Sequence, residues 1–125
     1  MAKTVPYNFV LDYLPDSVVL KYMFGWYYIY WGKKLMIVLS KVAKRAEWDG
    51  IWIATEIEHH ESLFKELPEL QPFFMDGVER QSKWLLLPAG AEDFETSAIK
   101  ICELISHGDL RMGRITKKAP AKSNF

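Results

Sequence analysis

The most regular pattern of hydrophobic positions lies between residues 20 and 41. Residues 20–31 are rich in aromatic side chains, which favour a pleated strand, and Gly32-Lys33 offers a tight turn with glycine at its first position. A second arm follows over residues 35–41, so the pattern predicts a β-hairpin. The alternation in this arm predicts one face made of Leu35, Ile37 and Leu39 and an opposite face made of Met36, Val38 and Ser40.

Three segments place apolar residues at helical spacing. Residues 7–14 predict a short helix, residues 56–67 a second one and residues 92–107 a third. Thr55 and Glu58 have the spacing of a capping box at the start of the second helix. Its apolar positions are Ile57, His60, Leu63, Phe64 and Leu67. The third helix has the clearest apolar face, made of Phe94, Ala98, Ile101, Cys102 and Ile105.

Shorter apolar runs at residues 51–54, 73–75 and 83–87 predict three further strands, with turn residues between them. Strands separated by hairpin-length turns, with helices before, within and after them, are typical of an α+β domain. We therefore predict a mainly antiparallel sheet of about five strands with about three helices packed on it.

Length and composition then limit the class of protein. The chain has 125 residues, enough for one domain, and 50% of them are hydrophobic, with 16 cationic residues balancing 16 acidic ones. We expect a single domain over residues 1–110 and a basic, partly flexible C-terminal tail over residues 111–125. This composition argues against a disordered chain and against a broad nucleic-acid-binding face.

Localisation signals point to the cytoplasm. Cys102 is the only cysteine, so an intrachain disulfide is impossible, which suits a reducing compartment. The N-terminus has no apolar core of signal-peptide length. Lys21 and the Lys33-Lys34 pair interrupt the apolar stretch of residues 18–39, so we expect no membrane span.

The segment Lys21-Tyr-Met-Phe-Gly-Trp-Tyr-Tyr-Ile-Tyr-Trp-Gly-Lys-Lys resembles the N-terminal domain of the TfoX family, whose hallmark is Met-Phe-Gly followed by a Tyr-rich strand and a hairpin. Trp26 stands where that family commonly has a small residue. Later segments resemble a bacterial uncharacterised branch of the family: Asp49-Gly-Ile-Trp-Ile-Ala-Thr, Glu58-His-His-Glu-Ser-Leu, Trp84-Leu-Leu-Leu-Pro-Ala, Asp93-Phe-Glu and Arg111-Met-Gly-Arg-Ile.

This resemblance implies a compact α+β domain without an established enzyme activity. TfoX proteins are regulators of natural competence that act with the transcription machinery, and they carry a second, C-terminal domain for which this chain has no room. The YjbR-like domains are similar and have been suggested to bind DNA.

Candidate catalytic and metal-binding residues are few. Glu56, Glu58, His59, His60 and Glu61 are the densest set of metal-ligand types, but they lack the His-Glu-x-x-His spacing and are typical of an acidic helix start. Cys102 falls within an apolar helix face, where a thiol packs as a small hydrophobe. No serine shows a nucleophile-elbow pattern, so we predict no catalytic residue, no metal and no cofactor.

The aromatic strand is the more informative candidate. Alternation would direct Tyr22, Phe24, Trp26, Tyr28 and Tyr30 to one side and Met23, Tyr27, Ile29 and Trp31 to the other. Two interpretations stay open, since these residues are either core under helices on both faces or an uncovered surface for a partner. For the second, we predict a partner-binding set of Phe24, Trp26, Tyr28 and Tyr30, contacting another protein or a second copy of the chain in a homodimer.

The basic C-terminal tail supports an alternative. Arg111, Arg114, Lys117, Lys118 and Lys122 occur there without an acidic residue after Asp109. The sequence thus predicts a non-enzymatic protein-association or regulatory domain in the cytoplasm, and alternatively a weak DNA-binding module that uses Arg111, Arg114, Lys117 and Lys118.

Overall fold

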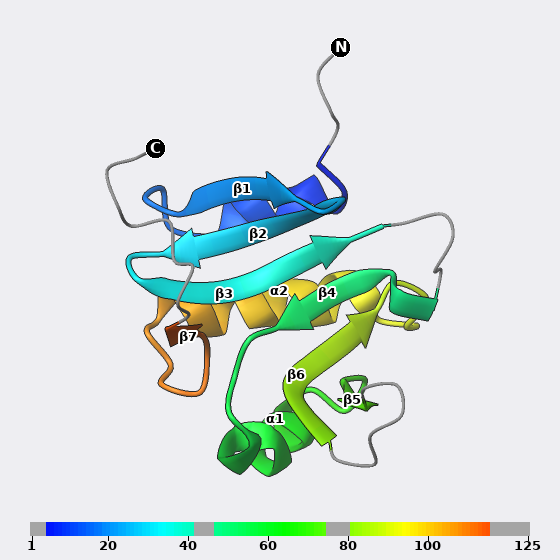
Figure 1. Ribbon diagram of the computed structural model, residues 1–125. Helices are drawn as coiled ribbons and strands as arrows, with labels where there is room; N and C mark the ends of the chain where they lie inside the picture. The colour runs from blue at the N-terminus through cyan, green and yellow to red at the C-terminus, as the bar shows by residue number, and fades with distance from the viewer. Residues whose placement is uncertain (1–4, 42–46, 75–80, 116–125) are drawn as a thin grey trace.

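The computed structural model describes residues 5–41, 47–74 and 81–115 and shows an open antiparallel sheet with helices packed against it (Figure 1). In chain order, the elements that position the site are the 3₁₀ helix η1 (Asn8–Tyr13), the strands β1 (Val19–Met23), β2 (Trp26–Trp31), β3 (Lys34–Ser40) and β4 (Gly50–Ile53), the 3₁₀ turn η3 (Ile57–His59), the helix α1 (His60–Glu66), the strands β5 (Gln71–Phe74) and β6 (Gln81–Pro88), the helix α2 (Phe94–Ser106) and the strand β7 (Arg114–Ile115). This confirms the α+β prediction.

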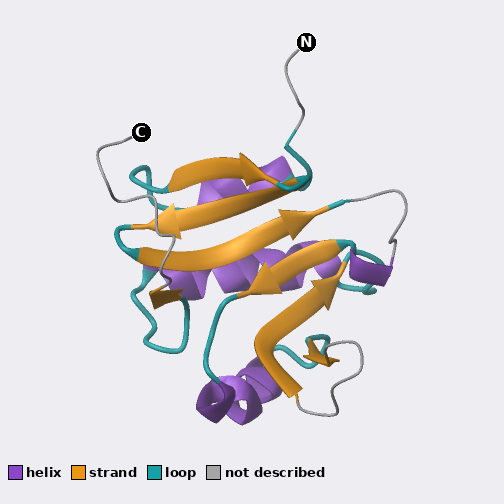
Figure 2. Cartoon of the chain, viewed as in Figure 1, coloured by secondary structure: helices purple, strands orange, loops and turns teal. Residues whose placement is uncertain are grey.

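The strands lie in the order β1-β2-β3-β4-β6-β5, and every neighbouring pair is antiparallel. β3 is long enough to pair with β4 through its C-terminal part and with β7 at its N-terminal end. Figure 2 shows α2 and η1 behind the sheet and α1 at its lower end, beside β6. None of these three helices lies on the opposite face of the sheet.

Apolar residues form a separate cluster on each face of the sheet. The larger core joins the sheet to the helices and includes Val10 of η1, Leu63 of α1 and Ile101 of α2. A smaller cluster on the opposite face consists of Tyr30, Leu35, Val38, Trp52, Ala54 and Leu86, with five partly buried aromatic residues packed against it. Both faces thus carry an apolar cluster, but η1, α1 and α2 cover only the larger one.

The predicted strand 20–31 is in fact two strands. Phe24 and Gly25 form a turn with φ angles of 55° and 86°, and β1 folds back onto β2. Tyr22 pairs in register with Tyr27, and their ring centroids lie 4.7 Å apart, so both side chains are on the same face. The prediction that Tyr22 shares a face with Trp26 was wrong, whereas the alternation within β2 itself is confirmed.

A β-bulge changes the predicted faces of β3. Ile29 pairs with Ile37, but Tyr30 pairs with Leu35, so Met36 is an extra residue between these pairs. Leu35 therefore joins Tyr30 in the smaller cluster and Met36 joins the larger core, opposite to the prediction. An extra residue moves the side chains before it to the opposite face of the strand. The alternation of residues in the sequence does not show where such a bulge occurs.

The predicted helix 56–67 is confirmed as η3 followed by α1, but its capping box is not formed. The hydroxyl of Thr55 donates to the carbonyl oxygen of Arg111 at 2.6 Å instead of capping the helix. Ile57, predicted to face the core, is 47% exposed because η3 turns it outward before the α-helical period begins. The structure confirms the predicted helices 7–14 and 92–107 and the predicted strands 51–54 and 83–87. It also confirms the predicted strand 73–75 as β5, although Met75 lies outside the described residues.

Residues 111–115 belong to the folded domain rather than to a tail. Met112 is buried in the larger core, the amide of Gly113 donates to the carbonyl oxygen of Ala54 at 2.7 Å, and β7 pairs with β3. The predicted boundary at residue 110 thus falls inside the fold. The other tail cations, Lys117, Lys118 and Lys122, lie outside the described residues.

Candidate functional site

The face of the sheet opposite η1, α1 and α2 contains a hollow of about 330 Å³. Its lining is almost entirely aromatic and consists of Trp26, Tyr28, Val38, Trp48, Trp52, Phe73, Ser82 and Trp84. Four of the five tryptophans of the chain take part, and the fifth, Trp31, packs on the helix-covered face. We call this site the aromatic hollow.

Strand alternation explains how these residues meet. Trp26 and Tyr28 are two positions apart on β2, and Val38 of β3 and Trp52 of β4 are register partners. Val38 and Trp52 are buried and form the floor, whereas Trp26, Tyr28 and Trp84 are partly exposed and form the walls. Trp84 lies on β6 and Phe73 on β5, so five neighbouring strands contribute to the hollow.

Edge-to-face aromatic contacts brace the walls. Trp48 lies between Trp26 and Phe73, with ring centroids 6.3 Å and 6.0 Å away. Phe73 packs edge-on against Trp52 at 4.9 Å, and the indole N–H of Trp52 donates to the carbonyl oxygen of Trp48 at 3.1 Å. Such pairs contribute about 0.5–1.5 kcal/mol each beyond their buried area, so they hold these rings in position before any ligand binds.

The polar groups of the hollow lie around its walls. The guanidinium carbon of Arg114 lies 5.7 Å from the ring centroid of Trp84, at cation–π distance. The hydroxyl oxygen of Ser82 accepts a hydrogen bond from the backbone amide of Trp84 at 3.1 Å. Burial, and secondly the neighbouring Tyr30, raise the pKa of Tyr28, so its phenol is protonated at neutral pH. These groups suit binding and provide no nucleophile with an adjacent base.

The structure divides the predicted partner-binding residues among three environments. Trp26 and Tyr28 line the hollow, Tyr30 is buried in the cluster below it, and Phe24 is 84% exposed at the β1–β2 turn. Four further aromatic residues of the hollow were not predicted, namely Trp48, Trp52, Phe73 and Trp84. A signal for two of them was the alternation of tryptophan with aliphatic residues in 51–53 and 84–86.

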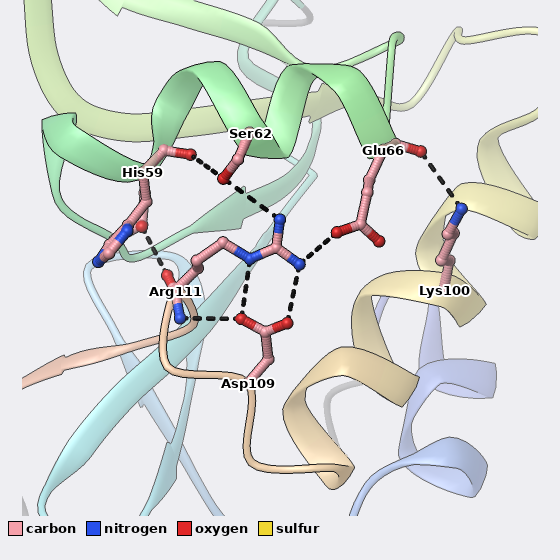
Figure 3. A network of polar contacts seen from close by, with 7 residues as sticks. His59, Ser62, Glu66, Lys100, Asp109 and Arg111 are labelled. Carbon is pink, nitrogen blue, oxygen red and sulfur yellow. Dashed lines mark hydrogen bonds and ion pairs between the residues drawn. The ribbon is translucent and has the colours of Figure 1, made fainter.

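A second cluster of polar residues centres on Arg111 (Figure 3). Its Nε and Nη2 atoms donate to the two carboxylate oxygens of Asp109 at 2.9 and 2.8 Å, Nη2 also pairs with Glu66, and Nη1 donates to the hydroxyl of Ser62 at 3.3 Å. These hydrogen bonds, chiefly that with Asp109, raise the pKa of Arg111, and the same bond lowers the pKa of Asp109 to about 2. The cluster ties α1 to the segment that follows α2.

Two of the candidate metal ligands, Glu56 and His60, contact Lys83. Glu56 pairs with Lys83 at 3.1 Å, and Nε2 of the buried His60 lies 3.0 Å from the carbonyl oxygen of Lys83. Within the described ranges, no group of three or more His, Cys, Asp or Glu residues could hold a metal ion. Cys102 is buried in the larger core, and burial raises the pKa of its thiol to about 12.

Comparison of the chain with models of protein families, with curated proteins and with solved structures found no match. None of the helices formed by the described residues has the length and apolar character needed to cross a membrane.

Proposed function

We propose that this chain is a non-enzymatic protein-association domain with a regulatory role, and that a protein partner inserts a large apolar side chain into the aromatic hollow. The observation that carries the proposal is a preformed apolar concavity, lined by four tryptophans, on the face of the sheet opposite η1, α1 and α2. Tryptophan and tyrosine are enriched in protein interfaces, and hot spots occur where an aromatic pocket receives an anchor residue.

The size of the hollow favours a side chain over a cofactor. Its volume of about 330 Å³ is at the lower end of the range for small-molecule pockets, and its lining offers few convergent polar groups. Burying one large aliphatic or aromatic side chain stabilises a complex by about 1.5–3 kcal/mol. The partner must therefore make further contacts around the rim, as expected for a protein.

The resemblance of residues 21–34 to the TfoX N-terminal domain supports the regulatory part of the proposal. Members of that family act with other proteins in transcription. We propose a distant relationship to that domain, with the hairpin β2–β3 as the shared element.

Selection of peptides from a random seven-residue display library tests the proposal. Wild-type protein should enrich peptides that share one large apolar residue. Tyr28→Glu, which places a charge in the hollow, should lose these peptides, while Phe24→Glu makes the same change at an exposed turn and should retain them. Circular dichroism and urea unfolding establish that both variants are folded. Enrichment that is equal on Tyr28→Glu and wild type would disprove binding at the hollow.

Light scattering of the same three proteins over a concentration series tests a second copy as the partner. A dimer that Tyr28→Glu dissociates and Phe24→Glu preserves would identify homodimerisation through the hollow. A monomer throughout would assign the hollow to a different protein.

A second candidate is weak binding of nucleic acid, which the position of Arg114 over Trp84 favours because cations beside aromatic rings suit phosphates and bases. Arg111 contributes less than predicted, since Asp109 and Glu66 already neutralise it. Titration of labelled duplex DNA near 50 mM salt and at higher salt tests this candidate, because phosphate contacts weaken steeply with salt. Absent or salt-independent binding would eliminate it.

A further inference from the structure

The strands of the sheet carry charges of one sign. Within the described ranges, the seven strands contain no acidic residue and four cationic ones, which are Lys21, Lys34, Lys83 and Arg114. Lys21 is the register partner of Tyr28, and Arg114 lies over Trp84, so two of these cations share the face of the aromatic hollow. Arg114 therefore places a cation beside the hollow that favours an anionic group.

The polar groups at the hollow also consist mainly of hydrogen-bond donors. The guanidinium of Arg114 has no carboxylate partner in the part of the chain that the structure describes, in contrast to that of Arg111. The indole N–H groups of Trp26 and Trp84 likewise make no hydrogen bond to described residues. Indole and guanidinium groups donate and do not accept, so an occupant has to supply acceptors.

From these observations we infer that the occupant is an acidic segment of a partner protein, with one large apolar side chain in the hollow and an Asp or Glu carboxylate on Arg114. This inference rests on the proposed function and adds the chemistry of the partner. Arginine binds a carboxylate through two parallel hydrogen bonds, and such charge-assisted bonds are about twice as strong as neutral ones. A basic segment would instead meet repulsion from Arg114.

Fluorescence anisotropy with four pools of fluorescein-labelled heptapeptides tests the inference. Three pools have Phe, Leu or Trp at the centre and flanking residues drawn from Asp, Glu and Gly, from Lys, Arg and Gly, or from Asn, Ser and Gly. The fourth pool combines acidic flanks with central Ala. The acidic pool with an apolar centre should bind wild-type protein about tenfold more tightly than the basic pool at about 100 mM salt, and the pool with central Ala should not bind.

Two variants with the same change of charge separate recognition from general electrostatics. Arg114→Glu should reverse the preference so that the basic pool binds more tightly than the acidic one. Lys83→Glu is the matched control, because Lys83 precedes Trp84 on β6 but pairs with Glu56 toward α1, on the other face. This variant should keep the acidic preference, with affinity within about twofold of wild type.

The outcomes distinguish this inference from the proposed function. Equal binding of acidic, neutral and basic pools would overturn the inference and leave the apolar anchor standing. Equal binding of pools with apolar and Ala centres would overturn both. Binding of single-stranded oligothymidylate that the acidic peptide pool displaces, and that both Tyr28→Glu and Arg114→Glu abolish, would assign the hollow to nucleic acid and overturn the inference for a protein partner.

Discussion

Replacing Asp109 by Asn should destabilise the protein at neutral pH and leave its stability nearly unchanged in acid. The Asp109 carboxylate accepts hydrogen bonds from Nε and Nη2 of Arg111 and from the backbone amide of Arg111, all within 2.9 Å. Asparagine keeps the shape and one acceptor oxygen but removes the charge. Asparagine also replaces one acceptor oxygen by an NH₂ donor, so the pH dependence of the loss identifies the electrostatic contribution of this ion pair.

The lowered pKa of Asp109 sets an upper limit on the free energy that the ion pair contributes to folding. The decrease of this pKa from 3.8 to about 2 corresponds to a stabilisation of at most about 2.4 kcal/mol, because each pKa unit is equivalent to 1.36 kcal/mol. The Asp109 side chain is 22% exposed and borders solvent, so screening reduces the expected loss to about 1 kcal/mol at pH 7. Because folding lowers this pKa, the stabilisation is present above pH 3.8, falls to about half near pH 3 and disappears below pH 2.

Urea unfolding of wild type and Asp109→Asn at pH 7, 5, 4 and 3, followed by circular dichroism, measures the difference in the free energy of unfolding. Asp16→Asn is the control, because Asp16 is exposed in the turn before β1 and has no ion pair within the described ranges. Its effect should stay within about 0.5 kcal/mol at every pH. A loss in Asp109→Asn that is the same at pH 7 and pH 3, or that grows in acid, would refute the electrostatic explanation.

Three further predictions concern the fold. Gly50→Ala should cost about 3 kcal/mol in urea unfolding, because φ at Gly50 is 143° and a Cβ would overlap the carbonyl oxygen of Leu87; a loss below about 0.5 kcal/mol would contradict the close approach of β4 and β6. Ile101→Ala should cost about 2–5 kcal/mol and Ile57→Ala under about 1 kcal/mol, since only Ile101 is buried, and equal losses would contradict the assigned core. The Cys102 thiol, with its pKa raised to about 12, should resist iodoacetamide at pH 8 until the chain is unfolded in urea, whereas rapid labelling of the folded protein would contradict its burial.

Local sequence patterns predicted most of the fold, and the errors have specific physical causes. The apolar face of α2 and the alternation in β2 are periodic, and they were placed correctly. The β1–β2 turn was missed because Phe24 adopts a positive φ that is uncommon for a residue with a side chain. The bulge at Met36 and the use of Thr55 to bind the carbonyl of Arg111 depend on distant segments, which local spacing does not encode.

The candidate site was predicted only in part for a related reason. Trp26 and Tyr28 were predicted because they stand in a dense aromatic run, whereas Trp52 and Trp84 are single tryptophans within aliphatic strands. They meet because β4 lies between β3 and β6, and strand order is a property of the whole sheet. The same holds for Arg114, which lies over Trp84 because β7 returns to β3.

The choice between core and surface for the aromatic residues depends on how fully they fill the space they enclose. Protein cores reach the packing density of organic crystals and leave few voids larger than a water molecule. The larger core follows this rule, with Ile29, Ile37 and Ile51 fully buried. The smaller cluster buries Val38 and Trp52 in the same way, yet it leaves about 330 Å³ between its partly exposed walls. Because the hollow opens at the surface, the proposed protein partner would supply the contacts that a core residue receives from its neighbours.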